Sequence, residues 1–303
     1  MTRTAPMTIL LALDGSAPSL VARDLAVSLP WPAGSTVHLL SAFTTPIDWT
    51  GGVASSMDWV GDAEDATRDE LLEQLRGFEA PLKDAGLHTQ AHAVAQRPAS
   101  AIIGLAREIA ADLILVGSRG HGPLRTMLLG SVATEVAERA HCPVLVARRP
   151  VAKSLVVGTD GSEPANAIPE QLAAWGIFEN APAAAVSVVV PDSAVFRVMV
   201  GVYTLGDDRL RRMQDQTREH AEQALAEMVR ALGAAGLAAT AHAREGDPAS
   251  EILAVATEVD ADLAVTGSRG LGGLERMVLG SVARNVLLHA ECSVLVMRQP
   301  DQE

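Results

Sequence analysis

Residues 116–120 of the chain read VGSRG, and after nine further residues the pair GS follows at 130–131. A short apolar run, Leu113 to Val116, precedes the glycines, and a helical pattern begins near Val132. The order is therefore strand, glycine-rich loop, helix. Glycine allows positive φ and close approach of backbone N–H groups, while a helix N-terminus adds unpaired donors and a partial positive charge. This combination predicts an anion site, for which phosphate is the usual ligand.

The same stretch recurs in the second half of the chain. Residues 266–270 read TGSRG, the pair GS follows at 280–281, and a helical pattern begins near Val282. A single glycine pair would be a weak signal. Two copies of G-x2-G-x9-G-S, each between a strand and a helix, favour phosphate binding over glycines that serve only tight turns.

A second signal is duplicated as well. Apolar runs at 8–13 and 154–159 each end in an Asp-Gly-Ser turn, which begins at Asp14 and at Asp160. The glycine loops repeat at a spacing of 150 residues and the two aspartates at 146. We therefore predict a tandem duplication of one α/β unit, with domains 1–149 and 150–303.

Short apolar strands alternate with helical patterns in both halves. The expected strands lie at 8–13, 37–43, 89–94, 113–116 and 144–147, then at 154–159, 186–190, 240–243, 263–265 and 294–297. The expected helices lie at 18–29, 62–85, 98–110 and 132–139, then at 207–232, 248–259 and from 282 onward. This alternation predicts an α/β fold with two tandem, doubly wound, five-stranded parallel sheets of order 3-2-1-4-5.

The predicted topology brings the two signals together. In a sheet of that order the winding reverses between the first and fourth strands, and ligands bind beyond the carboxyl ends of the strands there. Asp14 ends the first strand and Gly117 ends the fourth. A carboxylate opposite an anion-binding loop suits a nucleotide, with phosphates on the loop and the ribose or base near the aspartate. Asp160 and Gly267 repeat the arrangement.

The ends of the sheets suggest how the halves meet. The last strands, 144–147 and 294–297, are short and apolar, and such an edge favours pairing with another strand. We expect the halves to pack through these strands as a pseudo-dimer. The segments 44–61 and 191–206 lack clear periodicity and are expected to be irregular, which is typical of lids or binding loops. We expect ATP to order them and so to control the docking of an unidentified protein partner.

Composition limits the function. The net charge of −13 disfavours nonspecific DNA binding and an anionic membrane surface. Cys142 and Cys292 occupy matching places in the halves, where we expect small buried residues in a reducing cytosol rather than a disulfide framework. No apolar run reaches the length of a membrane span, and the N-terminus does not have the pattern of a signal peptide.

On these residues the chain resembles tandem members of the universal stress protein family of the ATP-binding type, over essentially its whole length. The pattern of that family is G-x2-G-x9-G-[S/T], with an Asp closing the first strand, and both halves match every position. The resemblance implies Rossmann-like domains that bind ATP, with Mg²⁺ held through the nucleotide phosphates. It also implies a soluble, cytoplasmic protein, commonly a homodimer, that is linked to survival under stress.

The resemblance assigns the site residues of each half. In the first half it places ribose and phosphates at Gly117, Gly120, Gly130 and Ser131, and adenine near Asp14 and Ala42. In the second half the corresponding residues are Asp160, Val188, Gly267, Gly270, Gly280 and Ser281. The predicted sites are completed by Arg119, Val132, Arg269 and Val282.

Several of these residues have a second interpretation. Arg119 and Arg269 could supply charge to phosphates or point away into solvent. The hydroxyls of Ser131 and Ser281 could bind phosphate, cap their helices, or do both. His121 follows the first loop, but Leu271 replaces it in the second, which argues against a catalytic histidine.

Other chemistries fit less well. His88 and His92 have metal-like spacing for a helix but fall on a predicted strand, where such positions are about 13 Å apart. We therefore expect no metal site there. The chain has no G-x4-G-K-[ST] loop and nothing that resembles a general base at the phosphates. We favour a nucleotide-dependent sensor or regulator, with an ATPase, autokinase or ligase as the enzyme alternative and a purely structural stress protein as the third.

Overall fold

The computed structural model describes residues 5–44, 58–120, 129–190, 207–268 and 279–298. The first half contains the strands β1 (Thr8–Ala12), β2 (Thr36–Phe43), β3 (His88–Ala95), β4 (Leu113–Gly117) and β5 (Val144–Ala147). Its helices are α1 (Ala17–Ser28), α3 (Asp58–Asp84), α4 (Pro98–Glu108) and α5 (Ser131–Arg139). The predicted irregular segment 191–206 lies outside the described residues, as do His121 and residues 45–57 of the other predicted segment, 44–61.

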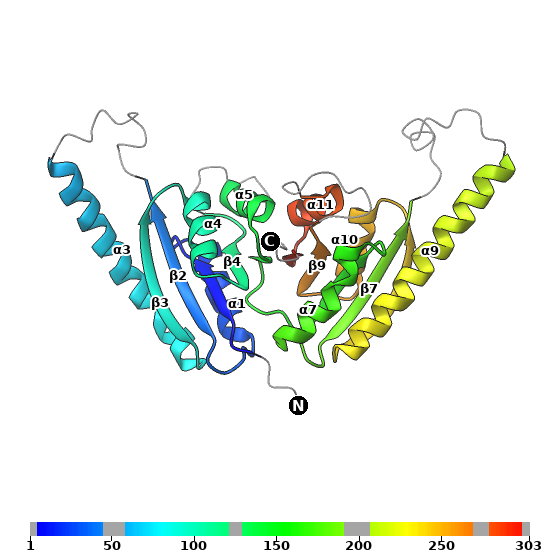
Figure 1. Cartoon of the computed structure of the whole chain (residues 1–303), viewed down its shortest axis with the longest axis horizontal. Coiled ribbons are helices and arrows are strands. Elements are labelled where there is room, and N and C mark those ends of the chain that lie inside the picture. Colours follow the sequence, from blue (N-terminus) through cyan, green and yellow to red (C-terminus); the bar gives the residue numbers. More distant parts are fainter. Residues whose placement is uncertain (1–4, 45–57, 121–128, 191–206, 269–278, 299–303) are drawn as a thin grey trace.

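The second half repeats this order of elements. Its strands are β6 (Leu155–Thr159), β7 (Pro182–Val189), β8 (Ala238–Glu245), β9 (Leu263–Gly267) and β10 (Ser293–Met297). Its helices are α6 (Glu163–Asn166), α7 (Ile168–Trp175), α9 (Asp207–Ala234), α10 (Pro248–Glu258) and α11 (Ser281–His289). The two halves spread from a central junction, with the long helices α3 and α9 along their outer sides (Figure 1).

All ten strands form one continuous sheet of order β3-β2-β1-β4-β5-β10-β9-β6-β7-β8. Each half therefore has the predicted order 3-2-1-4-5, and the prediction of two separate five-stranded sheets is refined to one shared sheet. Strands within a half are parallel, whereas β5 and β10 pair antiparallel, with Leu145 opposite Leu295. The predicted packing of the halves through their last strands is confirmed.

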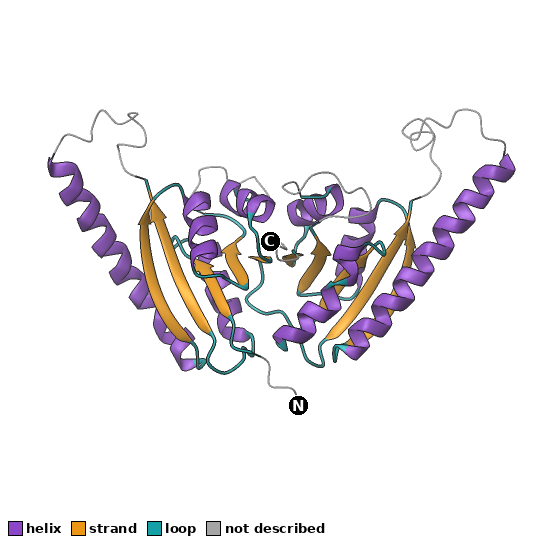
Figure 2. Ribbon diagram, viewed as in Figure 1, coloured by secondary structure: helices purple, strands orange, loops and turns teal. Residues whose placement is uncertain are grey.

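Helices cover both faces of this sheet (Figure 2). One core lies between the sheet and α1, α3, α7 and α9, and the other lies against α4, α5, α10 and α11. Successive residues of β1 alternate between the two cores, since Ile9 and Leu11 belong to the first and Leu10 to the second. Because both faces are buried, the central strands are continuous apolar runs rather than alternating ones.

The largest differences from the sequence prediction concern α3, β7 and the helix that corresponds to α1. Residues 58–61, expected to be irregular, form the beginning of α3. Strand β7 starts at Pro182 rather than at Val186, because the small residues at 183–185 pair with β6 and β8. The helix that corresponds to α1 is divided into α6 and α7, with Ala167 between them and Pro169 in the first turn of α7. Since proline has no N–H to donate, the helix begins anew there.

Candidate functional site

The turn after β1 places the first carboxylate at the carboxyl edge of the sheet. Gly15 has φ of +77°, a conformation that glycine adopts at little cost. This lets Asp14 turn back, so that its Oδ1 accepts hydrogen bonds from the Ser16 N–H at 3.0 Å and the Ser16 hydroxyl at 2.6 Å. Ser16 is also the N-cap of α1, and its Oγ accepts from the Ser19 N–H. Asp14 itself is exposed.

The glycine loop lies directly beside this turn. A Cβ added to Gly120 would be 2.5 Å from the Asp14 Oδ2 atom. A Cβ added to Gly117 would be 2.6 Å from the carbonyl carbon and oxygen of Pro18 and 2.7 Å from the Ser19 nitrogen, all in the first turn of α1. The prediction that Asp14 and the end of β4 are neighbours is therefore confirmed.

The reason for these glycines differs from the one expected. The backbone of Gly117, Gly120 and Gly130 does not adopt positive φ. Main-chain atoms of α1 exclude a side chain at Gly117, whereas a side chain at Gly120 would require that of Asp14 to move. The expectation of positive φ was wrong for these three glycines, whereas Gly15 and Gly161, both in the Asp-Gly-Ser turns, do adopt it.

The third glycine of the motif begins the next helix. Gly130 is the N-cap of α5, and its N–H donates to the carbonyl oxygen of Ser118 at 2.8 Å. Its own carbonyl oxygen accepts from the backbone N–H and the hydroxyl of Thr134. Ser131 is the first helical residue and is exposed, and Val132 after it is half-buried. The capping interpretation of Ser131 is therefore wrong, and its hydroxyl is displayed at the helix N-terminus.

The second half reproduces the described part of this geometry. Gly161 has φ of +74°, and the Ser162 N–H donates to Asp160 Oδ1 at 3.0 Å. Gly280 is the N-cap of α11 and donates its N–H to the Ser268 carbonyl oxygen at 2.8 Å, so Ser281 is not the cap here either. Gly267 ends β9, and Val282 is half-buried in the first turn of α11. Arg269 and Gly270 lie outside the described residues, as does Leu271.

Ala42 and Val188 lie at the same edge of the sheet. Ala42 is next to last in β2, two residues after Leu40, which pairs with Ala12 of β1. Val188 is next to last in β7 and pairs with Arg244 of β8. Both are half-buried. In the first half the structure thus gathers Asp14, the strand-2 end and the glycine motif at the topological switch point.

The two sites differ at the residue that contacts the Asp-Gly turn. Gln74 of α3 lies against Gly15, with its Nε2 atom 2.8 Å from the position of an added Cβ. His220 of α9 takes this place in the second half, and its Nε2 lies 3.3 Å from the carbonyl oxygen of Asp160. The Ser162 hydroxyl is buried and, within the described ranges, has no hydrogen-bond partner, unlike Ser16.

Two arginines follow the paired ends of β4 and β5. Arg119 is exposed, so its side chain is at the surface of the site. Arg148 follows β5, and the β4–β5 register places it beside Ser118, whose N–H donates to the Ala147 carbonyl oxygen at 3.1 Å. Burial lowers the pKa of Arg148 below its ordinary value, and Arg119 lowers it further, although Cys292 acts in the opposite direction.

The structure also places the histidines and cysteines that the sequence analysis considered. His88 and His92 lie on strand β3, and His92 pairs instead with His38 of β2. Among the residues that the structure describes, no group of three or more His, Cys, Asp or Glu could hold a metal ion. Cys142 and Cys292 are free and buried, as predicted. In the described part of the chain, no helix combines the length and apolar character that crossing a membrane requires.

The sequence profile of the universal stress protein family matches residues 7–148 and again residues 152–298. The chain belongs to the universal stress protein family. Universal stress protein Rv2624c of Mycobacterium tuberculosis is 27% identical over 302 residues, which cover 96% of each chain. The tandem arrangement therefore extends over nearly the whole of that relative.

Solved structures of universal stress proteins share this fold. One from Archaeoglobus fulgidus has a TM-score of 0.61 and 21% identity, covering 96% of this chain and 98% of its own. At that identity the likeness concerns the fold alone. Another universal stress protein, solved in complex with cAMP, covers 47% of this chain and 97% of its own, with 26% identity and a TM-score of 0.33.

The sequence reasoning missed Arg148 and Arg298, whose guanidinium groups donate to carbonyl oxygens of α11 and α5 in the opposite half. Arg298 follows β10 as Arg148 follows β5, and it is 8% exposed. A signal was available, because the two arginines are 150 residues apart, the same spacing as the glycine loops.

Proposed function

We propose that this universal stress protein binds one ATP in each half and acts as a nucleotide-dependent regulator in the stress response. The observation that carries the proposal is the contact between Gly120 and Asp14, where an added Cβ would be 2.5 Å from the carboxylate. It joins an exposed acidic group to a loop that leads into the N-terminus of α5. Unpaired N–H groups and the helix dipole make such an end favourable for phosphate.

The residues of the first half fit a nucleotide along the edge of the sheet. The first turn of α5, with the exposed Ser131 hydroxyl, would hold phosphates, and Arg119 would add positive charge. Asp14 and Ala42 would lie toward the ribose and adenine. Mg²⁺ would arrive with the phosphates. The second half offers Asp160, Gly280 and Ser281 for the same roles.

The proposed regulator also needs a cellular location and partners. We propose a cytoplasmic protein in which whole chains associate as homodimers and an unidentified protein partner responds to the bound nucleotide. The pairing of β5 with β10 occupies the sheet edges at the junction, so a dimer of whole chains would use other surfaces.

Calorimetric titration with ATP and Mg²⁺ tests the stoichiometry. We expect two equivalents per chain for the natural protein and one each for Gly120→Val and Gly270→Val. The double variant should bind none, because a branched side chain at Gly120 displaces Asp14 and blocks the close approach of a ligand. Gly104→Ala is the matched control, since Gly104 lies in α4 and, among the described residues, no atom beyond its own stretch of helix lies within 4 Å of an added Cβ.

Two results would contradict the proposal. One is a natural protein that takes up no nucleotide, and the other is a folded double variant that still binds two. Nucleotide recovered after incubation separates a regulator from an enzyme. Recovery of ATP supports the regulator, whereas release of ADP or AMP at about one per second or faster would indicate an enzyme.

A further inference from the structure

Each half of the molecule ends its sheet with an arginine that reaches into the other half. Arg148 follows β5, and its Nη2 donates to the carbonyl oxygen of Leu287 in α11 at 2.6 Å. Arg298 follows β10, and its Nη2 donates to the carbonyl oxygens of Ala137 and Glu138 in α5 at 2.6 and 2.7 Å. Ala137 and Leu287 are 150 residues apart, so the two contacts are equivalent under the internal repeat.

The acceptors are backbone groups at the C-terminal ends of the two helices. The last four carbonyl oxygens of a helix have no partner within it and carry a partial negative charge. A guanidinium supplies both a donor and a positive charge, so each arginine stabilises the end of a helix in the opposite half. The antiparallel β5–β10 pair makes this possible, because it places the end of one half's last strand beside the other half's final helix.

The same two helices begin at the proposed phosphate sites. Gly130 and Ser131 open α5, and Gly280 and Ser281 open α11. Each helix has nine residues, a length of about 13 Å. A short helix moves as one unit, so a displacement at its C-terminus alters the direction of its N-terminal N–H groups.

The backbone of each arginine is connected to the glycine loop of its own half. Ala147, which precedes Arg148, accepts a hydrogen bond from Ser118 of the first loop at 3.1 Å. Met297, which precedes Arg298, accepts one from Ser268 of the second loop at 2.9 Å. Each arginine thus joins the loop of one site to the helix of the other.

We propose that Arg148 and Arg298 are positioning residues through which each half aligns the phosphate-binding helix of the other half. Arg148 supports the site that begins at Ser281, and Arg298 supports the site that begins at Ser131. This inference rests on the proposed function for its effect on ligand binding. The alignment of the helices themselves can be measured without a ligand.

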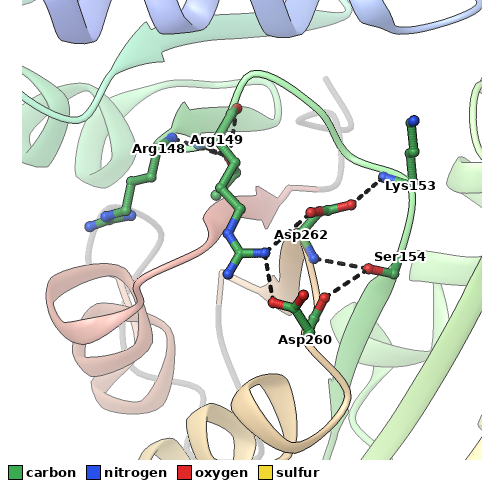
Figure 3. Close-up of polar contacts among 7 residues, drawn as sticks. Arg148, Arg149, Lys153, Ser154, Asp260 and Asp262 are labelled. Carbon is green, nitrogen blue, oxygen red and sulfur yellow. Dashed lines mark hydrogen bonds and ion pairs between the residues drawn. The ribbon is translucent and has the colours of Figure 1, made fainter.

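Arg149 provides a matched control. It is the next residue after Arg148 and also reaches across the junction, but its Nη1 contacts the carboxylates of Asp260 and Asp262 at 3.0 and 3.3 Å. Figure 3 shows its side chain directed to these aspartates while that of Arg148 points away from them. Arg149 therefore makes cross-half contacts through carboxylates that follow α10, and it does not bind the carbonyl oxygens of α5 or α11.

The binding test uses full-length proteins with one site disabled. Gly120→Val leaves only the second site, and Gly270→Val leaves only the first. With the second site alone, Arg148→Met should weaken ATP binding by about three- to tenfold, within the range that a cation at a helix end contributes. With the first site alone, Arg148→Met should change affinity less than about twofold. Arg298→Met should give the reverse pattern, and Arg149→Met should leave both sites within about twofold.

Amide hydrogen exchange, measured without nucleotide, reports the protection of the N–H groups in the two helices. The Arg284 N–H donates to Gly280 in the first turn of α11, and the Thr134 N–H donates to Gly130 in α5. Arg148→Met should accelerate exchange at Arg284 and not at Thr134, and Arg298→Met should do the opposite. Lysine retains a charge and a donor, so Arg148→Lys and Arg298→Lys should restore most of the protection and provide folded variants if the methionine forms aggregate.

The outcomes separate the two proposals. Three results for Arg148→Met and Arg298→Met would overturn the cross-half alignment. The variants could weaken ATP binding only at the site of their own half, weaken it equally at both sites, or change neither binding nor exchange. If the natural protein binds no nucleotide but exchange shows the crossed pattern, the proposed function fails and the alignment stands. If binding occurs with two equivalents and the crossed pattern is missing, only the alignment fails.

Discussion

At the scale of single residues, Gly117 is required by close approach rather than by an unusual backbone. A methyl group at Gly117 would meet main-chain atoms of Pro18 and Ser19 at 2.6–2.7 Å. Main-chain atoms of a helix cannot rotate away as a side chain can. We therefore expect Gly117→Ala to lower the free energy of unfolding by about 1–3 kcal/mol, as overpacking usually does. Urea denaturation at pH 7.5 measures this.

Gly104 provides the control for that substitution. It is an exposed residue in the middle of α4, and in the described part of the chain nothing outside the adjacent helix backbone lies within 4 Å of an added Cβ. Gly104→Ala should raise stability by about 0.5–1 kcal/mol, since alanine is the better helix former. Equal effects of the two substitutions would show that contact with α1 does not restrict Gly117.

The glycine spacing was enough to locate the first site but not to explain it. Sequence repeats identified Gly117, Gly120 and Gly130 and placed Asp14 beside them. They could not reveal that Asp14 Oδ2 itself occupies the space beside Gly120, because a contact between residues 106 positions apart depends on the packing of loop against turn. Gln74 and His220 were missed for the same reason, since each comes from a long helix whose charge pattern gave no indication of a site.

At the scale of elements, strands β2 and β3 carry a pair of histidines only in the first half. His38 Nδ1 lies 2.9 Å from His92 Nε2, and the rings stack at 5.1 Å. Burial lowers the pKa of both, the charge of His92 lowers that of His38 further, and Glu108 partly raises that of His92. The hydrogen bond itself needs one nitrogen as donor and the other as acceptor.

The lowered pKa values predict an acid-sensitive fold. The folded state binds fewer protons than the unfolded one, whose histidines titrate near pH 6.5. The stability from the pair is therefore complete above about pH 6.5 and decreases as pH falls toward the folded-state values. Urea unfolding at pH 7.5 and 5.5 should show a larger loss for the natural protein than for His38→Ala.

The second half already has the arrangement that His38→Ala would produce in the first. Ala184 occupies the position equivalent to His38, and His242, which corresponds to His92, contacts the Thr240 hydroxyl instead. The first half with His38→Ala thus imitates a natural arrangement. Parallel pH profiles for the two proteins would rule out the histidine pair as the source of acid sensitivity.

Element boundaries were predicted best where side chains are large. Strand β5 has the expected residues, Val144–Ala147, because branched apolar residues begin and continue it. Strand β7 begins earlier than predicted, because Ala183, Ala184 and Ala185 carry little strand preference of their own and are held by neighbours on both sides. The helix between β6 and β7 was not specified from the sequence, and its division into α6 and α7 coincides with Pro169 in the first turn of α7.

At the scale of the whole molecule, the junction combines a strand pair with polar contacts around the linker. Ser293 is fully buried, and its hydroxyl accepts hydrogen bonds from the N–H groups of Arg148 and Arg149, both at 3.1 Å. Arg149 also makes the ion pairs with Asp260 and Asp262 (Figure 3). The pairing of the halves was predictable from two short apolar edge strands, whereas these contacts depend on the register between them.

The two kinds of polar contact should differ in strength. Ser293→Ala leaves two backbone N–H groups without their acceptor and should cost about 1–3 kcal/mol in unfolding free energy. Arg149→Met removes ion pairs to Asp260, which is 85% exposed, and to the more buried Asp262, and should cost about 0–1 kcal/mol. Thermal or urea unfolding at moderate salt compares them. A larger loss for Arg149→Met would show that the ion pairs, and not the buried hydroxyl, hold the linker.

The β5–β10 pair joins two parts of one polypeptide, and this has a consequence for dilution. Between separate chains, the fraction of paired halves would fall as the protein concentration decreases. The short connection from β5 to β6 instead keeps the two halves at a fixed effective concentration of millimolar order. The halves are always present in equal numbers, and each always meets the same neighbour. A difference such as Gln74 in one half and His220 in the other is therefore present in every molecule instead of being distributed among mixed assemblies.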